Sequence, residues 1–143
     1  MNIAELTVSL HNNTLSPIRR IAKKHCISSS QLLCIISIPS DGINQTNLAT
    51  LLSIDISTLS RNLHHLIKKK LITKKNTKYD NRSYQILITK DGEILCNKIF
   101  QSLESYFNDI NLILDDQEIE TLIDVLLRFN WLLLKKKTDN API

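Results

Sequence analysis

The stretch INQTNLATLLSIDISTLSRNLHHLIKKKLI, residues 43–72, indicates two short helices separated by a tight turn. Apolar residues recur at helical spacing through residues 45–52 and again through residues 57–70, while residues 53–56 read as the turn. Ser57 is a candidate N-cap of the second helix. The expected inward positions are Leu48, Leu51 and Leu52 in the first helix and Leu59, Leu63, Leu66 and Ile67 in the second.

The outer face of the second helix is polar and basic. Residues three and four positions apart share one face of an α-helix, because each residue advances by about 100°. Two short helices joined by a tight turn, the second with a polar and basic outer face, are typical of a helix-turn-helix. The positions expected on that outer face are Thr58, Arg61, Asn62, His65 and Lys68.

A β-hairpin is expected directly after the second helix. Residues 71–75 and 83–89 read as two strands around a polar tip at residues 76–82. Side chains alternate in direction along residues 83–88, as they do in a short strand. A hairpin that follows a helix-turn-helix makes a winged helix-turn-helix, which we expect over residues 28–90.

The segment before this part is expected to be helical. Residues 3–24 carry apolar residues at helical spacing, but Pro17 suits a first helical turn, so one helix with a break or two helices are both consistent with the pattern. Ser28 offers an N-cap for the next helix, and the turn residues 39–42 end it.

Two long helices are expected after the hairpin, over residues 91–114 and 115–137, and both are apolar around more than one face. Such helices need cover on several sides. We therefore expect a homodimer in which residues 1–25 and 91–137 form dimerisation helices of a single domain, residues 1–143; a monomer with a large core is the alternative. The expected fold class is mainly α with a small β-hairpin wing, a winged helix-turn-helix flanked by N- and C-terminal dimerisation helices.

Basic residues are concentrated in one part of the chain. Residues 56–90 hold nine basic residues and one acid, a net charge of +8, whereas the remainder holds nine basic and 13 acidic residues, a net charge of −4. A basic block inside an acidic scaffold indicates a polyanionic partner for that block. A solvated lysine-rich face without a partner is the alternative.

Export and membrane insertion find no support in the pattern. The N-terminus has no basic region followed by a long apolar stretch. The most apolar run, residues 125–134, is interrupted by charge and is shorter than the roughly 20 residues that a membrane span needs. Three cysteines at no recurring spacing suit reduced thiols, so we expect a cytoplasmic protein without a membrane partner.

Catalytic motifs and cofactor motifs are not evident, so we expect no enzyme activity, no cofactor and no metal site. His64 and His65 are adjacent on a helix and diverge by about 100°, which prevents them from chelating one metal together. Cys26 follows several basic residues that could lower a thiol pKa, so it is a candidate redox site. Cys34 and Cys96 are expected to be buried as small hydrophobic residues.

Three short motifs, in this order and spacing, resemble the MarR family of bacterial transcription regulators: TLSRNLHHLIKKKLI (58–72), DNR (80–82) and LITKDG (87–92), with QTNLATLLSIDIS (45–57) in register before them. The resemblance implies an obligate dimer with interlocked terminal helices that binds a pseudo-palindromic double-stranded DNA operator. It also implies, as for many members, modulation by a small-molecule effector or an oxidant.

Two positions depart from the pattern of the family. The family usually has glycine where Lys70 stands, so Lys70 must adopt a helix-ending conformation that glycine adopts more easily. The family also often has arginine where Lys74 and Lys75 stand, and lysine keeps a phosphate contact but not bidentate geometry.

DNA would be read by helix 57–70 in the major groove and by the wing, residues 76–82, in the minor groove. Arg61 can form two hydrogen bonds to guanine and Asn62 can pair with adenine. The resemblance implies that Arg82 enters a narrow A·T-rich minor groove, oriented by Asp80. The candidate DNA-binding residues are Ser57, Thr58, Ser60, Arg61, Asn62, His65, Lys68, Lys74, Lys75, Lys78, Asp80 and Arg82.

Two other function classes stay open at this point. A winged-helix module that binds a partner protein and no longer reads DNA is the first, although the basic block argues against it. A metal- or thiol-dependent enzyme is the second.

Overall fold

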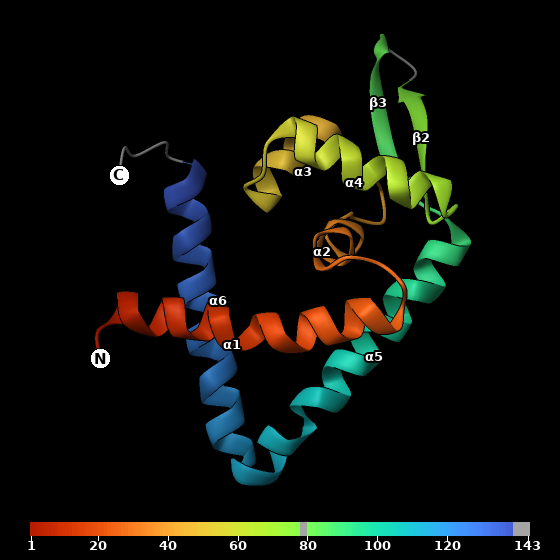
Figure 1. Ribbon diagram of the computed structural model, residues 1–143. Coiled ribbons are helices and arrows are strands. Elements are labelled where there is room, and N and C mark those ends of the chain that lie inside the picture. Colours follow the sequence, from red (N-terminus) through yellow and green to blue (C-terminus); the bar gives the residue numbers. More distant parts are fainter. Residues whose placement is uncertain (78–79, 139–143) are drawn as a thin grey trace. The chain divides into compact units, whose positions relative to one another are not determined.

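The computed structural model describes residues 1–77 and 80–138 and separates the chain into two compact units, Met1–Glu104 and Ser105–Ile143. The fold is mostly helical with one small antiparallel sheet, which confirms the expected fold class (Figure 1). The elements in chain order are α1 (Ile3–Lys24), α2 (Ser29–Ile36), β1 (Ile43–Asn44), α3 (Gln45–Leu52), α4 (Ile56–Lys68), β2 (Ile72–Thr77), β3 (Asp80–Ile88), α5 (Lys90–Ile113) and α6 (Asp116–Thr138).

The first two helices begin with the same kind of cap. At the start of α1, the Asn2 side chain accepts a hydrogen bond from the Glu5 backbone, and the Glu5 carboxylate accepts one from the Asn2 backbone, both at 2.9 Å. Ser28 and Gln31 form the same reciprocal pair at α2, each bond 3.1 Å long, which confirms the predicted N-cap. Pro17 is buried inside α1, so residues 3–24 form one helix rather than two.

The core of the first unit lies where α1, α2, α3, α4, the sheet and the first part of α5 meet. The stripe of α4 is buried at Leu59, Leu63 and Leu66 as predicted. Ile67 of α4 is 37% exposed and Leu51 of α3 is 45% exposed, so the predictions that these two side chains face inward are wrong. Ile67 lies about 100° round the helix from Leu66, at the edge of the buried stripe. The largest fully buried side chains are Leu32, Ile35, Leu48, Leu59, Leu63, Leu66, Ile86, Ile99, Pro17 and Cys34.

The sheet has the strand order β1-β3-β2, with both pairings antiparallel. Figure 1 shows β2 and β3 as a hairpin that extends beyond α4. The two strands pair from Ile72–Ile88 to Thr77–Asp80, with an irregularity at Asn76 and Thr77, so they extend further into the polar tip than predicted. The residues at the tip are polar, so no alternation of apolar and polar side chains could have indicated a strand there. The two-residue β1 is too short for any periodicity to predict.

The junction of α4, β2 and α5 depends on a left-handed residue and a close approach of two chain segments. Lys70 has φ +59°, as the resemblance implied for a helix end, and its N–H bonds the carbonyl of Ile67 at 2.8 Å. The Thr89 hydroxyl donates to the Lys70 carbonyl at 2.7 Å and accepts from the Gly92 N–H at 3.1 Å. A Cβ atom on Gly92 would lie 2.0 Å from the carbonyl oxygen of Leu71, so only glycine fits there.

We predict that Gly92→Ala lowers the free energy of unfolding by about 2–3 kcal/mol or more, because backbone rather than a side-chain tip must move. Chemical denaturation followed by circular dichroism measures this. The control is Gln101→Ala at an exposed position of α5, expected to change stability by less than about 0.5 kcal/mol. Equal stabilities of the two variants would contradict the close approach.

Candidate nucleic-acid interface

The N-terminus of α4 is capped by Asp55, two residues before the predicted cap, Ser57. The Asp55 carboxylate accepts a hydrogen bond from the Thr58 N–H at 2.8 Å and another from the Thr58 hydroxyl at 2.7 Å. Both bonds lower the pKa of Asp55, and the bond from the Thr58 hydroxyl has the larger effect. The prediction of Ser57 as the N-cap is therefore wrong: it lies inside the first turn and is exposed. The hydroxyl hydrogen of Thr58 is already used in the cap.

The outer face of α4 carries Arg61 in an exposed position. One of its guanidinium nitrogens, Nη2, donates to the Thr58 hydroxyl at 3.4 Å, a long bond that leaves most of the guanidinium's donors for a partner. Two histidine rings, His64 and His65, lie further along with centroids 6.0 Å apart. The exposed residues on this helix are Ile56, Ser57, Ser60, Arg61, His64, His65, Ile67 and Lys68. Ile56 and His64 were not among the predicted site residues.

Asn62 does not lie on this outer face, and its predicted outward position is wrong. It is 8% exposed, and its side-chain nitrogen donates to the Ser30 hydroxyl of α2 at 2.6 Å. Asn62 is three residues after Leu59 and four before Leu66, so it lies at the edge of their buried face, where α2 covers it. The assignment of Asn62 to adenine reading thus loses its geometric basis.

Gln45, the first residue of α3, contacts both α4 and β2 and was not among the residues predicted from the sequence. Its side-chain nitrogen donates to the Ser60 hydroxyl on α4 at 2.8 Å. Its side-chain oxygen accepts from the Lys74 ammonium on β2 at 3.5 Å. The partners lie 15 and 29 positions away, so no local pattern could reveal the cluster.

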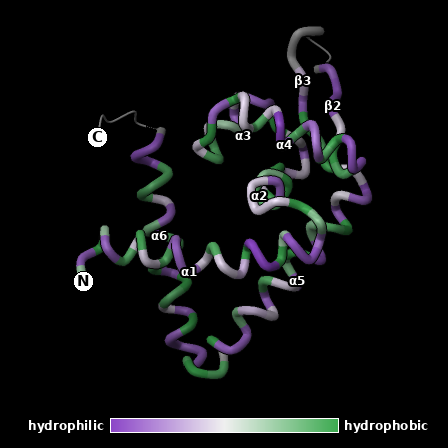
Figure 2. Tube along the Cα trace, viewed as in Figure 1, coloured by the Kyte–Doolittle hydropathy of each residue, from purple (hydrophilic) through white to green (hydrophobic). Residues whose placement is uncertain are grey.

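Lysines surround the end of α4 and the start of the wing. Lys68, Lys69 and Lys70 are exposed at the end of the helix, and Lys74 and Lys75 are exposed on β2. Figure 2 shows hydrophilic colouring along β2 and over parts of α4. These side chains extend the polar face of α4 onto the wing.

The wing tip falls largely outside what the structure describes. Lys78 lies outside the described residues. The backbone of Asp80 and Arg82 belongs to β3, but their side chains are not described. The pair in which Asp80 orients Arg82 therefore stays a prediction.

The cysteines occupy different environments. Cys34 and Cys96 are buried as predicted, and burial raises the pKa of the Cys34 thiol to about 11 and also raises that of Cys96. Cys26 is exposed just after α1, in a left-handed conformation with φ +56°. Neighbouring His25 has a pKa lowered by burial and by Lys24 and Lys98. A redox role of Cys26 stays a prediction.

Over residues 1–77 and 80–138, no group of three side chains is arranged to hold a metal ion. Within the same residues, no helix has the length and apolar character to cross a membrane.

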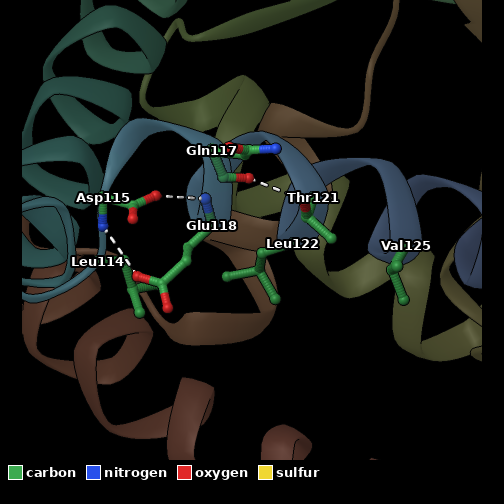
Figure 3. A pocket seen from close by; sticks show the side chains of 7 residues that line it. All are labelled: Leu114, Asp115, Gln117, Glu118, Thr121, Leu122 and Val125. Atoms are coloured by element: carbon green, nitrogen blue, oxygen red, sulfur yellow. Dashed lines mark hydrogen bonds between the residues drawn. The ribbon is translucent and has the colours of Figure 1, made fainter.

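The second unit contains an open hollow of about 520 Å³ at the start of α6 (Figure 3). Asp115 and Glu118 cap the helix reciprocally on one side of it, with bonds of 3.0 and 2.8 Å. Its lining is mostly apolar, and Figure 3 shows the side chains that form it. The lining residues are Leu114, Asp115, Gln117, Glu118, Thr121, Leu122 and Val125.

Residues 27–84, which run from the end of α1 into β3, match the model of the MarR family. This part of the chain is therefore similar to the MarR family. The matched region holds the predicted helix-turn-helix and most of the wing, and no curated protein matches the chain in sequence.

Solved structures share the MarR-like fold well beyond the matched region. Apo MarR from E. coli is 20% identical, with a TM-score of 0.78 over 90% of this chain and 96% of its own. A MarR mutant from E. coli complexed with operator DNA is 20% identical, with a TM-score of 0.70 over 89% and 92%. S. aureus MepR in a DNA complex is 20% identical, with a TM-score of 0.70 over 90% and 96%. At this identity, these likenesses establish the fold.

We predict that Asn62→Ala lowers the free energy of unfolding by about 1–2 kcal/mol, because it removes a mostly buried hydrogen-bonding amide. A double-mutant cycle with Ser30→Ala measures the pair, and we expect a coupling energy of about 0.5–1.5 kcal/mol. Asn97→Ala, at an exposed position of α5, is the control. Strict additivity of the two substitutions would show that the hydrogen bond contributes nothing.

Proposed function

We propose that this MarR-like protein is a sequence-specific DNA-binding transcription regulator. The observation that carries the proposal is the outer face of α4, where exposed Arg61 and Ser60 stand on a helix whose opposite stripe is fully buried. A helix of this kind fits the major groove, in which each base pair presents its own pattern of donors and acceptors. Two structures of the same fold support the proposal further, because the E. coli MarR mutant was solved with operator DNA and S. aureus MepR was solved in a DNA complex.

The roles of the residues follow from their chemistry. Arg61 has guanidinium donors left for O6 and N7 of a guanine, and Ser57 and Ser60 have hydroxyls for bases or phosphates. The Thr58 hydroxyl donates its hydrogen to Asp55, so we propose that toward DNA it acts only as a hydrogen-bond acceptor and otherwise belongs to the helix cap. The remaining contacts we propose are phosphate contacts from His65, Lys68, Lys74, Lys75 and Lys78 and minor-groove entry of Arg82 beside Asp80.

The protein would act as a homodimer on a pseudo-palindromic operator. No side chain of α6 between Asp116 and Lys137 is buried, although the helix carries large apolar residues on several sides. Exposed apolar surface of this extent is typical of an interface. We propose that residues 28–90 of a single domain bind DNA while residues 1–25 and 91–137 dimerise. The exposed apolar residues of α6 are Leu122, Ile123, Val125, Leu126, Leu127, Trp131, Leu132, Leu133 and Leu134.

The remaining parts of the proposal follow from the family. A transcription regulator of this kind needs no enzyme activity, and we place it in the cytoplasm, where DNA is accessible to a bacterial regulator. A small-molecule effector stays a prediction; the hollow at the start of α6 offers an apolar lining, but the chemistry of that lining singles out no ligand.

Binding to DNA duplexes tests the proposed function directly. Fluorescence anisotropy with random and A·T-rich duplexes should show binding that weakens steeply with salt, because lysine contacts release counterions. With about five phosphate contacts in each protomer, about ten in the dimer, each doubling of the salt concentration lowers affinity by about 500-fold. Lys68→Gln removes one contact from each protomer and should reduce the slope by about two units, whereas Lys98→Gln on α5 should leave it unchanged. Absent or salt-insensitive binding would overturn the proposal in favour of a protein-interaction module.

The wing has its own test. Arg82→Ala should weaken binding by about 1–3 kcal/mol and relax the preference for A·T pairs that flank the major-groove site. The matched control is Arg19→Ala, which removes an exposed arginine of α1. Selection from a random duplex pool reads both affinity and base preference. An unchanged affinity would mean that the wing does not engage DNA.

A further inference from the structure

Gln45 stands where three elements of the proposed interface meet. It is the half-buried first residue of α3, while its partners Ser60 on α4 and Lys74 on β2 are exposed. The amide bonds both partners at once, at 2.8 Å to Ser60 and 3.5 Å to Lys74. Because Gln45 is half-buried, water competes less for these bonds. With both its nitrogen and its oxygen bonded, the amide has little freedom to turn.

The chemistry of Lys74 settles which way the amide points. An ammonium group only donates hydrogen bonds, so the amide atom that faces Lys74 must be the oxygen. The nitrogen then faces Ser60 and donates to it, and the Ser60 oxygen accepts. This orientation follows from the network itself.

The orientation decides what Ser60 can do. Ser102 and Thr121 donate their hydroxyl hydrogens to the backbone carbonyl four residues earlier, at 2.8 Å each, and so satisfy them within the helix. The Ser60 oxygen instead accepts from Gln45, which leaves its hydroxyl hydrogen to donate to another acceptor. On the exposed side of α4, that acceptor would be a purine N7, a guanine O6, a thymine O4 or a phosphate oxygen.

The contact to Lys74 connects the same amide to the wing. Lys74 pairs with Ile86 in the hairpin, two positions along β2 from its start at Ile72. The contacts of Gln45 with Lys74 and Ser60 thus connect this strand to α4.

We propose that Gln45 is a positioning residue for DNA recognition, which directs the Ser60 hydroxyl toward a hydrogen-bond acceptor on DNA and links Lys74 to α4. The inference rests on the proposed function. It assigns base or phosphate contact to Ser60 and a supporting role to Gln45.

The test uses the full-length protein and duplexes selected by the wild type from a random-sequence pool. Gln45→Ala and Ser60→Ala should each weaken binding to the best duplex about five- to tenfold. The double variant should bind about as tightly as the weaker-binding single variant, because both substitutions remove the same contact. If Ser60 contacts a base, both single variants lose preference at the same base position of each half-site; if it contacts a phosphate, both lose affinity without a change of preference. Gln101→Ala on α5 removes an exposed glutamine outside the cluster and should change neither quantity.

A charge variant separates positioning from general support of the fold. In Gln45→Glu the carboxylate only accepts, so the Ser60 hydroxyl must donate to it and is lost to DNA, while the contact to Lys74 gains charge. We expect the same change of base preference as in Ser60→Ala, with a thermal midpoint close to that of the wild type. This variant also serves if Gln45→Ala does not fold.

The outcomes are distinct. If Gln45→Ala binds within about twofold of the wild type with the same preference, or if its effect multiplies with that of Ser60→Ala, the positioning role is wrong while the DNA-binding function stands. If the wild type selects no duplex, the proposed function fails and this inference fails with it.

Discussion

The burial of Leu59, Leu63 and Leu66 is the constraint on which the rest of the first unit depends. Each fully buried leucine stabilises the fold by about 1.5–3 kcal/mol, and the three share one stripe of α4. A rotation of the helix by one residue would expose this stripe and carry polar side chains into the core. The stripe therefore determines which side chains, Arg61 among them, face away from the protein.

The ends of α4 are held by polar contacts that complement this stripe. At its start, Asp55 satisfies the Thr58 N–H and lowers the freedom of the first turn. At its end, Lys70 accepts a left-handed conformation that costs a non-glycine residue about 1–2 kcal/mol. The cost is offset by the bond from Lys70 to Ile67 and by Thr89, which joins the helix end to the start of α5.

Much of the fold and part of the site could be predicted from local patterns. The predicted limits of α3 and the Ser28 cap agree with the structure, because each depends on neighbours within a few residues. The left-handed Lys70 agrees with what the resemblance to the MarR family implied. Ile67 and Asn62 were assigned to the wrong faces. A helical wheel gives an angle, but how deeply each angle is buried depends on the elements that pack on the helix. For Asn62 that element is α2, which supplies the hydroxyl of Ser30.

The sequence by itself determined the class of fold, the order of the elements and the concentration of charge on one segment, because periodicity, turn residues and composition are local properties. Only the tertiary structure decided that Asn62 faces α2 and that Gln45 joins α3, α4 and β2. Hydrogen bonds between residues 15 to 32 positions apart leave no periodic trace in a sequence. They form because the packed core brings those segments within bonding distance, and the direction in which Ser60 can donate is set there.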